Sequence, residues 1–342
     1  MAETSPRTVQ EREITAPVAL TDARGDLNPA AVGYTRTQLH DTSGVTRRAW
    51  GRNKRWEYWS VIGPRYMVSL TVSAVDYVGS EEVWVYDRQT GAEHHATAIV
   101  PFARGVELPA TLGEGPARVR TNGLEIVIEP RADRAWRLAA RIPGVTADLL
   151  ATPPVGSEAL GVVVPWSDRR FQYTVKAVAI PATGTIRIGD DEIAIDADGE
   201  AWAVLDHGRG RWPYDVKWNW AAGSGIVDSR RIGIQLGAQW TDGTGSTENA
   251  LFVDGRLHKI SEELEWQYDT ADYLAPWRIR GERADLTFTP FHDKVSRTAL
   301  GIISTRTDQC FGHWTGWMAT DDGRRIPVDG AIGFAEDVHN RW

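Results

Sequence analysis

One short stretch of the chain is dense in side chains that could take part in chemistry. Residues 206–220 contain two aspartates, one histidine, three tryptophans and a tyrosine. A carboxylic acid in an apolar, tryptophan-lined pocket has a raised pKa and could donate a proton, and a histidine titrates near neutrality. Asp206 and His207 are therefore candidate catalytic residues. The same pair could instead hold a turn through side-chain-to-backbone hydrogen bonds, and both interpretations stay open.

A direct hydrogen bond between Asp206 and His207 sets a structural condition. Neighbouring residues of a strand point to opposite faces, so the bond requires a bulge or a turn. Gly208 and Gly210 follow at once, and we expect them to permit such a bulge.

The aromatic residues of this stretch are candidates for substrate binding. Trp218 and Trp220 share a strand face by period two, and with Trp212 they could offer ring faces that stabilise a developing cation. Tyr214 and Asp215 follow a proline, where we expect a turn that presents a polar group to a ligand. Filling of the protein core is an equally open interpretation of the tryptophans.

Acidic positions later in the chain add to the candidate site. Glu248 and Asn249 begin an apolar strand, and within a barrel one of them must point inward because side chains alternate. A buried carboxylate needs a partner or a role. We expect Glu248 to be catalytic, and Asn249 and Glu336 to bind substrate. The alternative for these acids is exposure at strand ends.

Short strands are the elements that must position these side chains. Apolar and polar residues alternate in many segments with turn signals between them, and Asn122-Gly123 and Asp254-Gly255 predict tight hairpins. A further hairpin is expected across residues 181–184. More than a dozen such strands predict an all-β antiparallel fold of two consecutive barrels or sandwiches. We expect an N-terminal arm over residues 1–45, a first barrel over 46–200 and a second barrel over 201–342.

Composition excludes several classes of partner. The net charge of −8 disfavours nucleic acid and anionic membrane surfaces. No run of about 18 apolar residues occurs, so no membrane span is expected. Cys310 is the only cysteine, which excludes an intrachain disulfide and fits a reducing cytosol. Residues 1–13 lack the apolar core of a signal peptide. We therefore expect a cytoplasmic protein.

Neither a metal nor an organic cofactor is indicated by the motifs. The eight histidines are scattered and no cysteine pair exists. No Gly-x-Gly-x-x-Gly motif follows a strand and no P-loop is present. We therefore expect no metal and no cofactor.

Several motifs in the same order resemble a bacterial family, the domain of unknown function 2804. They include residues 165–176, 205–214, 218–220, 247–249, 253–255 and 333–337. That family is distantly similar to the superfamily of hydroxyneurosporene synthase (a carotenoid hydratase) and AttH. This resemblance implies two lipocalin-like β-barrels with a ligand site between or within them.

The hydratases of that superfamily carry an Asp-His-Asn-Trp-Gly motif, whose histidine and tryptophan are implicated in acid-catalysed addition of water to an alkene. Asp206 and His207 match its first two positions, while Gly208 and Arg209 replace the Asn-Trp pair. The resemblance therefore implies the barrel fold more directly than the reaction.

Three functions fit these features. The first is a cofactor-independent lyase or isomerase that hydrates, isomerises or cyclises an apolar small molecule in an aromatic pocket. The second is a non-catalytic, lipocalin-like binder of a lipid or isoprenoid. The third is a carbohydrate-active protein, because tryptophan platforms and paired carboxylates also suit sugar rings.

Overall fold

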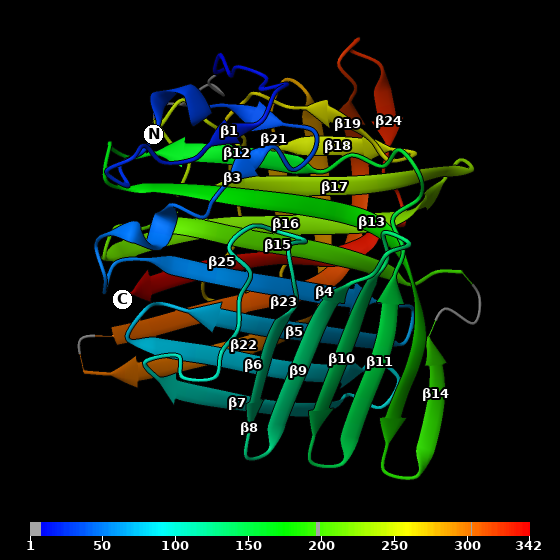
Figure 1. Cartoon of the computed structure of the whole chain (residues 1–342). Coiled ribbons are helices and arrows are strands. Elements are labelled where there is room, and N and C mark those ends of the chain that lie inside the picture. Colours follow the sequence, from blue (N-terminus) through cyan, green and yellow to red (C-terminus); the bar gives the residue numbers. More distant parts are fainter. Residues whose placement is uncertain (1–7, 196–198, 302) are drawn as a thin grey trace.

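Antiparallel strands build most of the chain (Figure 1). The computed structural model describes residues 8–195, 199–301 and 303–342. Their strands form two large sheets that follow one another in sequence, a nearly closed barrel and then a half-barrel. The prediction of an all-β fold with two consecutive lipocalin-like barrels is therefore confirmed. Among the described residues, none of the helices is long and apolar enough to cross a membrane.

The first sheet has 13 strands in the described part of the chain. Strands β8 to β11 run across the direction of β4 to β7, so the sheet curls into a barrel (Figure 1). Its members are β2 (Tyr34–Thr35), β4 (Lys54–Ile62), β5 (Tyr66–Ala74), β6 (Val78–Asp87), β7 (Ala92–Pro101), β8 (Ala117–Thr121), β9 (Leu124–Pro130), β10 (Trp136–Ile142), β11 (Val145–Ala151), β12 (Leu160–Pro165), β13 (Phe171–Ile188), β14 (Asp191–Ile195) and β15 (Trp202–Arg211).

The second sheet has ten strands in the described residues, and β16, β25, β23 and β22 are its central neighbours. Its members are β16 (Asp215–Val227), β17 (Arg230–Ala238), β18 (Ala250–Val253), β19 (Arg256–Lys259), β20 (Glu265–Gln267), β21 (Trp277–Arg280), β22 (Ala284–Leu300), β23 (Ile303–Ala319), β24 (Arg325–Pro327) and β25 (Ile332–Arg341). Strand pairing passes from the first sheet to the second between Arg211 and Asp215. The proposed division at residue 201 falls just before β15.

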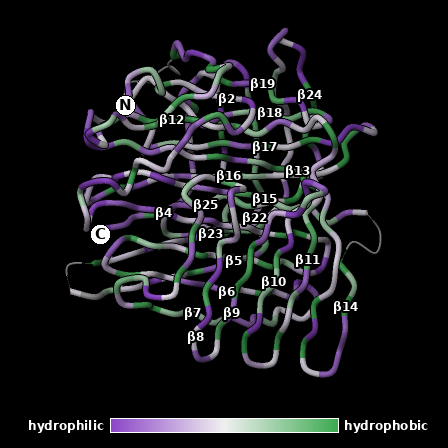
Figure 2. The backbone as a smooth tube through the Cα atoms, in the orientation of Figure 1, coloured by the Kyte–Doolittle hydropathy of each residue, from purple (hydrophilic) through white to green (hydrophobic). Residues whose placement is uncertain are grey.

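Side-chain alternation gives each sheet an apolar face. In β9, Leu124, Ile126 and Ile128 are buried while the residues between them are more exposed, and Figure 2 shows such changes of hydropathy along the strands. One apolar core fills the first barrel and a second lies against the half-barrel. A third cluster, which includes Trp84 and Phe334, joins the two sheets. Both faces of the strands near this junction are consequently covered.

The turn signals were accurate at the ends of short strands and misleading in a long one. Asn122-Gly123 joins β8 to β9 and Asp254-Gly255 joins β18 to β19, as predicted. The hairpin expected at residues 181–184 is wrong, because β13 is one strand of 18 residues. A bulge between Ala177 and Ile180 lets it change partners without turning back.

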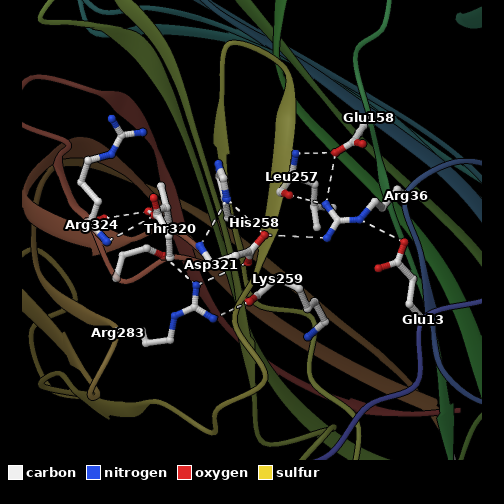
Figure 3. Close-up of polar contacts among 12 residues, drawn as sticks. Glu13, Arg36, Glu158, Leu257, His258, Lys259, Arg283, Thr320, Asp321 and Arg324 are labelled. Carbon is white, nitrogen blue, oxygen red and sulfur yellow. Dashed lines mark hydrogen bonds and ion pairs between the residues drawn. The ribbon is translucent and has the colours of Figure 1, made fainter.

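The N-terminal arm lies against both sheets. Its short elements are β1 (Val18–Ala19), η1 (Pro29–Ala31), β3 (His40–Asp41) and η2 (Val45–Arg47), while β2 pairs with β12. Ion pairs help to hold the arm in place. Figure 3 shows Arg36 between Glu13 and Glu158, and Arg36 Nε lies 3.1 Å from Glu13 Oε1. The guanidinium also donates to the carbonyl of Leu257 in β19.

A buried ion pair makes a second anchor for the arm. Glu11 Oε2 lies 2.6 Å from Lys259 Nζ, and the two side chains are only 1% and 4% exposed. Glu11 also accepts hydrogen bonds from the backbone N–H and the hydroxyl of Thr247. The arm thereby fixes the residue that immediately precedes Glu248.

We predict that Glu11→Gln lowers the free energy of unfolding by about 3–5 kcal/mol, because it leaves the Lys259 ammonium buried without its charge partner. Urea denaturation measures the change. Asp148→Asn is the matched control: its pair with Arg137 is 57% and 38% exposed, so the loss should stay below about 1 kcal/mol. Equal losses in the two variants would contradict the buried anchor.

Candidate functional site

A cavity of about 320 Å³ lies between the facing surfaces of the two sheets. We call it the inter-sheet cavity. Both sheets contribute polar and aromatic side chains to its lining. Those used below are Trp56, Tyr58, Glu82, Thr174, Lys176, Asp206, Trp212, Trp218, Trp220, Trp240, Glu248, Lys294, Gln309, Glu336 and Trp342.

A row of five side chains crosses the first sheet on the side of this cavity. Strand register pairs Lys176 with Asp206, Asp206 with Tyr58, Tyr58 with Thr71, and Thr71 with Glu82. Residues opposite each other in paired strands project from the same face of a sheet. The five side chains, contributed by β13, β15, β4, β5 and β6, therefore all line the inter-sheet cavity.

A second row crosses the half-barrel and faces the first. Register pairs Trp220 with Glu336, Glu336 with Gln309, and Gln309 with Lys294, across β16, β25, β23 and β22. Three contacts join the rows: Lys176 Nζ lies 3.6 Å from the centre of the Trp220 ring, Gln309 Nε2 lies 3.2 Å from Tyr58 Oη, and Lys294 Nζ lies 2.6 Å from Glu82 Oε2.

Lys176 lies at the centre of the charged groups. Its Nζ is 3.2 Å from Asp206 Oδ1 and 3.5 Å from Glu248 Oε2, and the Lys176 side chain is 5% exposed. A buried ammonium requires such compensation. The ring face of Trp220 adds a cation–π contact. Lys176 thus holds two carboxylates from distant parts of the chain in one place.

Asp206 is held by donors from the first sheet. Thr174 Oγ1 donates to its Oδ1 at 2.7 Å and Trp56 Nε1 donates to its Oδ2 at 2.9 Å. The Trp56 ring lies across Gly208, where a Cβ would stand 2.2 Å from the ring. Glycine at 208 therefore makes room for the tryptophan that orients Asp206.

Glu248 is a buried acid at the rear of the cavity. Trp240 Nε1 donates to its Oε1 at 2.6 Å, and its side chain lies over Gly237, where a Cβ would meet it at 2.0 Å. Burial raises the pKa of Glu248 to about 7, although the charge of Lys176 lowers it. The group can thus gain or release a proton near neutrality.

Glu336 is the second such acid. Its Oε1 accepts the Trp218 indole N–H and its Oε2 accepts from Gln309 Nε2, both at 2.9 Å. Burial raises the pKa of Glu336 to about 7, and the hydrogen bond from Trp218 works in the opposite direction. Glu248 and Glu336 therefore carry similar acidity within one cavity.

The two ends of the inter-sheet cavity differ in chemistry. Tryptophans gather at the end beside β13, β15 and β16, where Trp212 stacks on Trp240 with ring centres 5.0 Å apart. Hydroxyl groups line the end beside β22 and β23, as the cross-strand pairs Ser296–Thr307 and Thr298–Thr305. A ligand that fills the cavity would meet ring faces at one end and hydrogen-bonding groups at the other.

Six of the predicted site residues line the inter-sheet cavity. They are Asp206, Trp212, Trp218, Trp220, Glu248 and Glu336.

His207 lies elsewhere, because β15 is regular at this point and the bulge expected after Asp206 is absent from the described pairing. Its ring points into the first barrel, 3.5 Å from Glu57. Burial lowers the pKa of His207 well below its ordinary value.

Three more predicted residues lie outside the cavity lining. Tyr214 is 39% exposed. Asp215 is exposed and contacts His339 and Arg341, at 2.7 and 2.8 Å. The Asn249 amide accepts from the Gly237 N–H and donates to the Glu262 carbonyl. The Asn249 side chain thus links the start of the strand that follows Glu248 to residues 237 and 262.

Sequence reasoning missed Lys176, Trp56, Trp240 and Gln309. Lys176 had a visible signal, since it is the one charged residue in the apolar run of residues 171–180. For Trp56 and Trp240 the sequence held no signal other than the residue type. The place of Gln309 in the cavity depends on pairing between strands that are distant in sequence. As to metals, the described residues contain no group of three His, Cys, Asp or Glu side chains placed to hold an ion.

Comparisons with known proteins agree with this fold. The family model described as Domain of unknown function (DUF2804) matches residues 11–342. No match was found among curated proteins.

Solved structures share the architecture at low sequence identity. Kievitone hydratase from Nectria haematococca is similar over 99% of this chain and 98% of its own, at 11% identity and a TM-score of 0.52. CghA is similar over 96% and 94%, at 13% identity and a TM-score of 0.55. A putative AttH from Nitrosomonas europaea is similar over 84% and 92%, at 12% identity and a TM-score of 0.50.

The buried acids predict a dependence of stability on pH. Glu248 and Glu336 have pKa values of about 7 in the folded chain against an ordinary 4.5. The folded state therefore keeps protons that the unfolded state releases between these values, and the free energy of unfolding falls as the pH rises from about 4.5 to 7. Each of Glu248→Gln and Glu336→Gln should reduce that fall by about 2–3 kcal/mol.

Urea denaturation at a series of pH values measures this effect. Glu200→Gln, at an exposed position, is the control and should leave the pH profile unchanged. If the Glu248→Gln and Glu336→Gln profiles run parallel to that of the unmodified protein, the two carboxyls do not carry the raised pKa values.

Proposed function

Since this chain belongs to the family described as Domain of unknown function (DUF2804), we propose its function from the inter-sheet cavity: it is a lyase- or isomerase-type enzyme that moves a proton to or from an apolar small molecule. The observation that carries the proposal is the pair Glu248 and Glu336. Both are buried, both line one aromatic cavity, and burial raises both pKa values to about 7.

Two carboxyls of similar acidity can divide the work of acid and base. Near pH 7 one can be protonated while the other is ionised, which matches the operating pH to the catalytic pKa. The protonated group donates to a carbon–carbon double bond or a carbonyl group of the substrate. The ionised group then takes a proton from a neighbouring carbon in an isomerisation, or from an attacking water molecule in a hydration.

The other side chains that line the inter-sheet cavity would assist this proton transfer. The faces of Trp212, Trp218 and Trp220 stabilise positive charge that develops on the substrate. Lys176 and Asp206 hold Glu248 in a fixed electrostatic setting and contact the cavity directly. The hydroxyls of β22 and β23 would hold a polar end of the substrate, so we propose a molecule with an apolar, ring-sized part and a hydrogen-bonding part.

Names of structural neighbours support the choice of reaction class. One protein of this fold is named a hydratase, kievitone hydratase, and another, CghA, was crystallised with Sch210972. At 11–13% identity the likeness concerns the fold, so the argument for this chain rests on its own two carboxyls.

We predict that Glu336→Gln and Glu248→Gln each slow proton transfer by about 10²–10⁴-fold, since an amide cannot act as acid or base. The measurement is solvent deuterium uptake, by mass spectrometry, into a panel of apolar enones and conjugated alkenes incubated in D₂O. Uptake should peak near pH 7 and fall on both sides, because it needs one carboxyl protonated and one ionised.

Asp215→Asn, on an exposed residue outside the cavity, is the matched control and should keep the unmodified rate. Retention of full deuterium uptake by both glutamine variants would refute the catalytic proposal. If a lipid or isoprenoid binds equally well to all variants and takes up no deuterium, the protein is a binder.

A carbohydrate-active protein is the second candidate, favoured by the hydroxyl-lined end of the cavity. It would instead hydrolyse or bind a glycoside, which a panel of nitrophenyl glycosides detects.

A further inference from the structure

A second cavity, also of about 320 Å³, is lined mainly by the first barrel, together with residues 36–38 of the arm and with Phe252 and Gly255 of the second sheet. We call it the first-barrel cavity. It lies on the opposite face of β13 and β15 from the inter-sheet cavity: Val175 and Leu205 line it, whereas the next residues, Lys176 and Asp206, line the other cavity. The same strands thus separate two compartments, and a ligand in one cannot touch the acids of the other.

A bulge in β13 shapes the wall of this cavity. The register shifts between Ala177 and Ile180, and the residues from 177 to 180 all line the cavity. Ala179 has a φ of 53°, a left-handed conformation that costs a residue with a Cβ about 1 kcal/mol or more. Its N–H donates to Ser224 Oγ at 2.9 Å, which holds the strained backbone in place. Such strain, kept beside a cavity, is a common mark of a binding site.

The apolar wall contains an unused hydrogen-bond donor. Trp59 is 1% exposed and lines the cavity, yet its Nε1 has no hydrogen-bond partner among the described residues. Trp136 packs beside it with ring centres 5.3 Å apart. Buried indole N–H groups usually have an acceptor. Without such an acceptor, the two tryptophans offer their apolar ring faces to a bound molecule.

The lining of the first-barrel cavity includes three arginines. Arg36, Arg131 and Arg134 lie there with a single acid, Glu158. Figure 3 shows that Arg36 is already engaged, between Glu13 and Glu158. The other two guanidinium groups of this lining are those of Arg131 and Arg134.

Arg131 is 4.0 Å from Asp133, and both are at least half exposed. Arg134 forms no ion pair within the described ranges 8–195, 199–301 and 303–342. A carboxylate is the group that such a pair of guanidiniums would recognise.

We propose that the first-barrel cavity is a second ligand site, which binds an apolar monocarboxylate of medium chain length. Its volume lies at the lower end of the range for small-molecule pockets. The apolar body packs on Trp59, Trp136 and Leu205 inside the barrel. The carboxylate lies against Arg131 and Arg134. This site is independent of the proton transfer proposed for the inter-sheet cavity.

Isothermal titration of the full chain with decanoate tests the proposal, with 1-decanol as the uncharged probe of the same length. Decanoate should bind with one-to-one stoichiometry and at least tenfold more tightly than 1-decanol. The double variant Arg131→Ala/Arg134→Ala should weaken decanoate at least tenfold and leave 1-decanol unchanged. Arg120→Ala/Arg141→Ala, at two exposed arginines of the same barrel, is the matched control and should bind as the unmodified protein does.

A second pair of variants locates the ligand. Ala177→Phe fills the first-barrel cavity and should abolish binding, whereas Thr307→Phe narrows the inter-sheet cavity and should leave it intact.

Three results would each overturn the proposal. One is the absence of decanoate binding to the unmodified protein. Another is equal affinity for decanoate in the Arg131→Ala/Arg134→Ala variant and its control. The third is loss of binding in Thr307→Phe with retention in Ala177→Phe, which would place the molecule between the sheets.

Discussion

The burial of one ammonium group, that of Lys176, constrains the way the two sheets meet. The charge is 3.2 Å from Asp206, 3.5 Å from Glu248 and 3.6 Å from the Trp220 ring centre. Asp206 comes from β15 of the first sheet, whereas Trp220 lies in β16 of the second sheet and Glu248 directly precedes β18 of that sheet. Removing either carboxylate would leave the buried charge undercompensated, at a cost of several kcal/mol. The relative position of the sheets is therefore part of the electrostatic design of the cavity.

Strand alternation decides which motif residues reach this charge. Along β15, Asp206, Gly208 and Gly210 face the inter-sheet cavity, while His207 and Arg209 face the first barrel. The glycines are needed on the crowded face, because a Cβ at 208 would strike Trp56 and one at 210 would strike Gln172 and the backbone of β13. The motif thus combines one acid with the space for the tryptophan that orients it.

The sequence was sufficient for the fold class and for part of the site. Alternating patterns and Asn-Gly or Asp-Gly turns act over a few residues, so they predicted the strands and the short hairpins. The path of β13 was not predictable in this way, because the bulge at Ala177–Ile180 depends on the strands that pair on either side of it. Two consecutive barrels or sandwiches were expected from the strand count, and their lipocalin-like form was implied by the resemblance of the ordered motifs to the family.

The partners of the acids were harder to predict, for a physical reason. Lys176 and Asp206 are neighbours only through the register of β13 with β15, and Gln309 reaches Glu336 only through β23 with β25. Such cross-strand and cross-sheet contacts leave no local pattern. A lone lysine in an apolar strand is the exception, since burial of its charge requires a carboxylate from somewhere else in the chain.

His207 and Asp206 are neighbours in β15, yet their side chains lie in different environments on opposite faces of the strand. Inside the first barrel, burial lowers the pKa of His207 and raises the pKa of Glu57 to about 7. Their contact at 3.5 Å therefore joins a neutral imidazole to a carboxyl that is partly protonated near pH 7. Arg209, 3.6 Å from Glu57, supplies the positive charge on this face. An imidazole so placed cannot exchange protons with a ligand between the sheets without crossing the backbone of β15. The proton transfer proposed for the inter-sheet cavity is therefore assigned to two of its carboxyls, Glu248 and Glu336, whose pKa values burial raises to about 7.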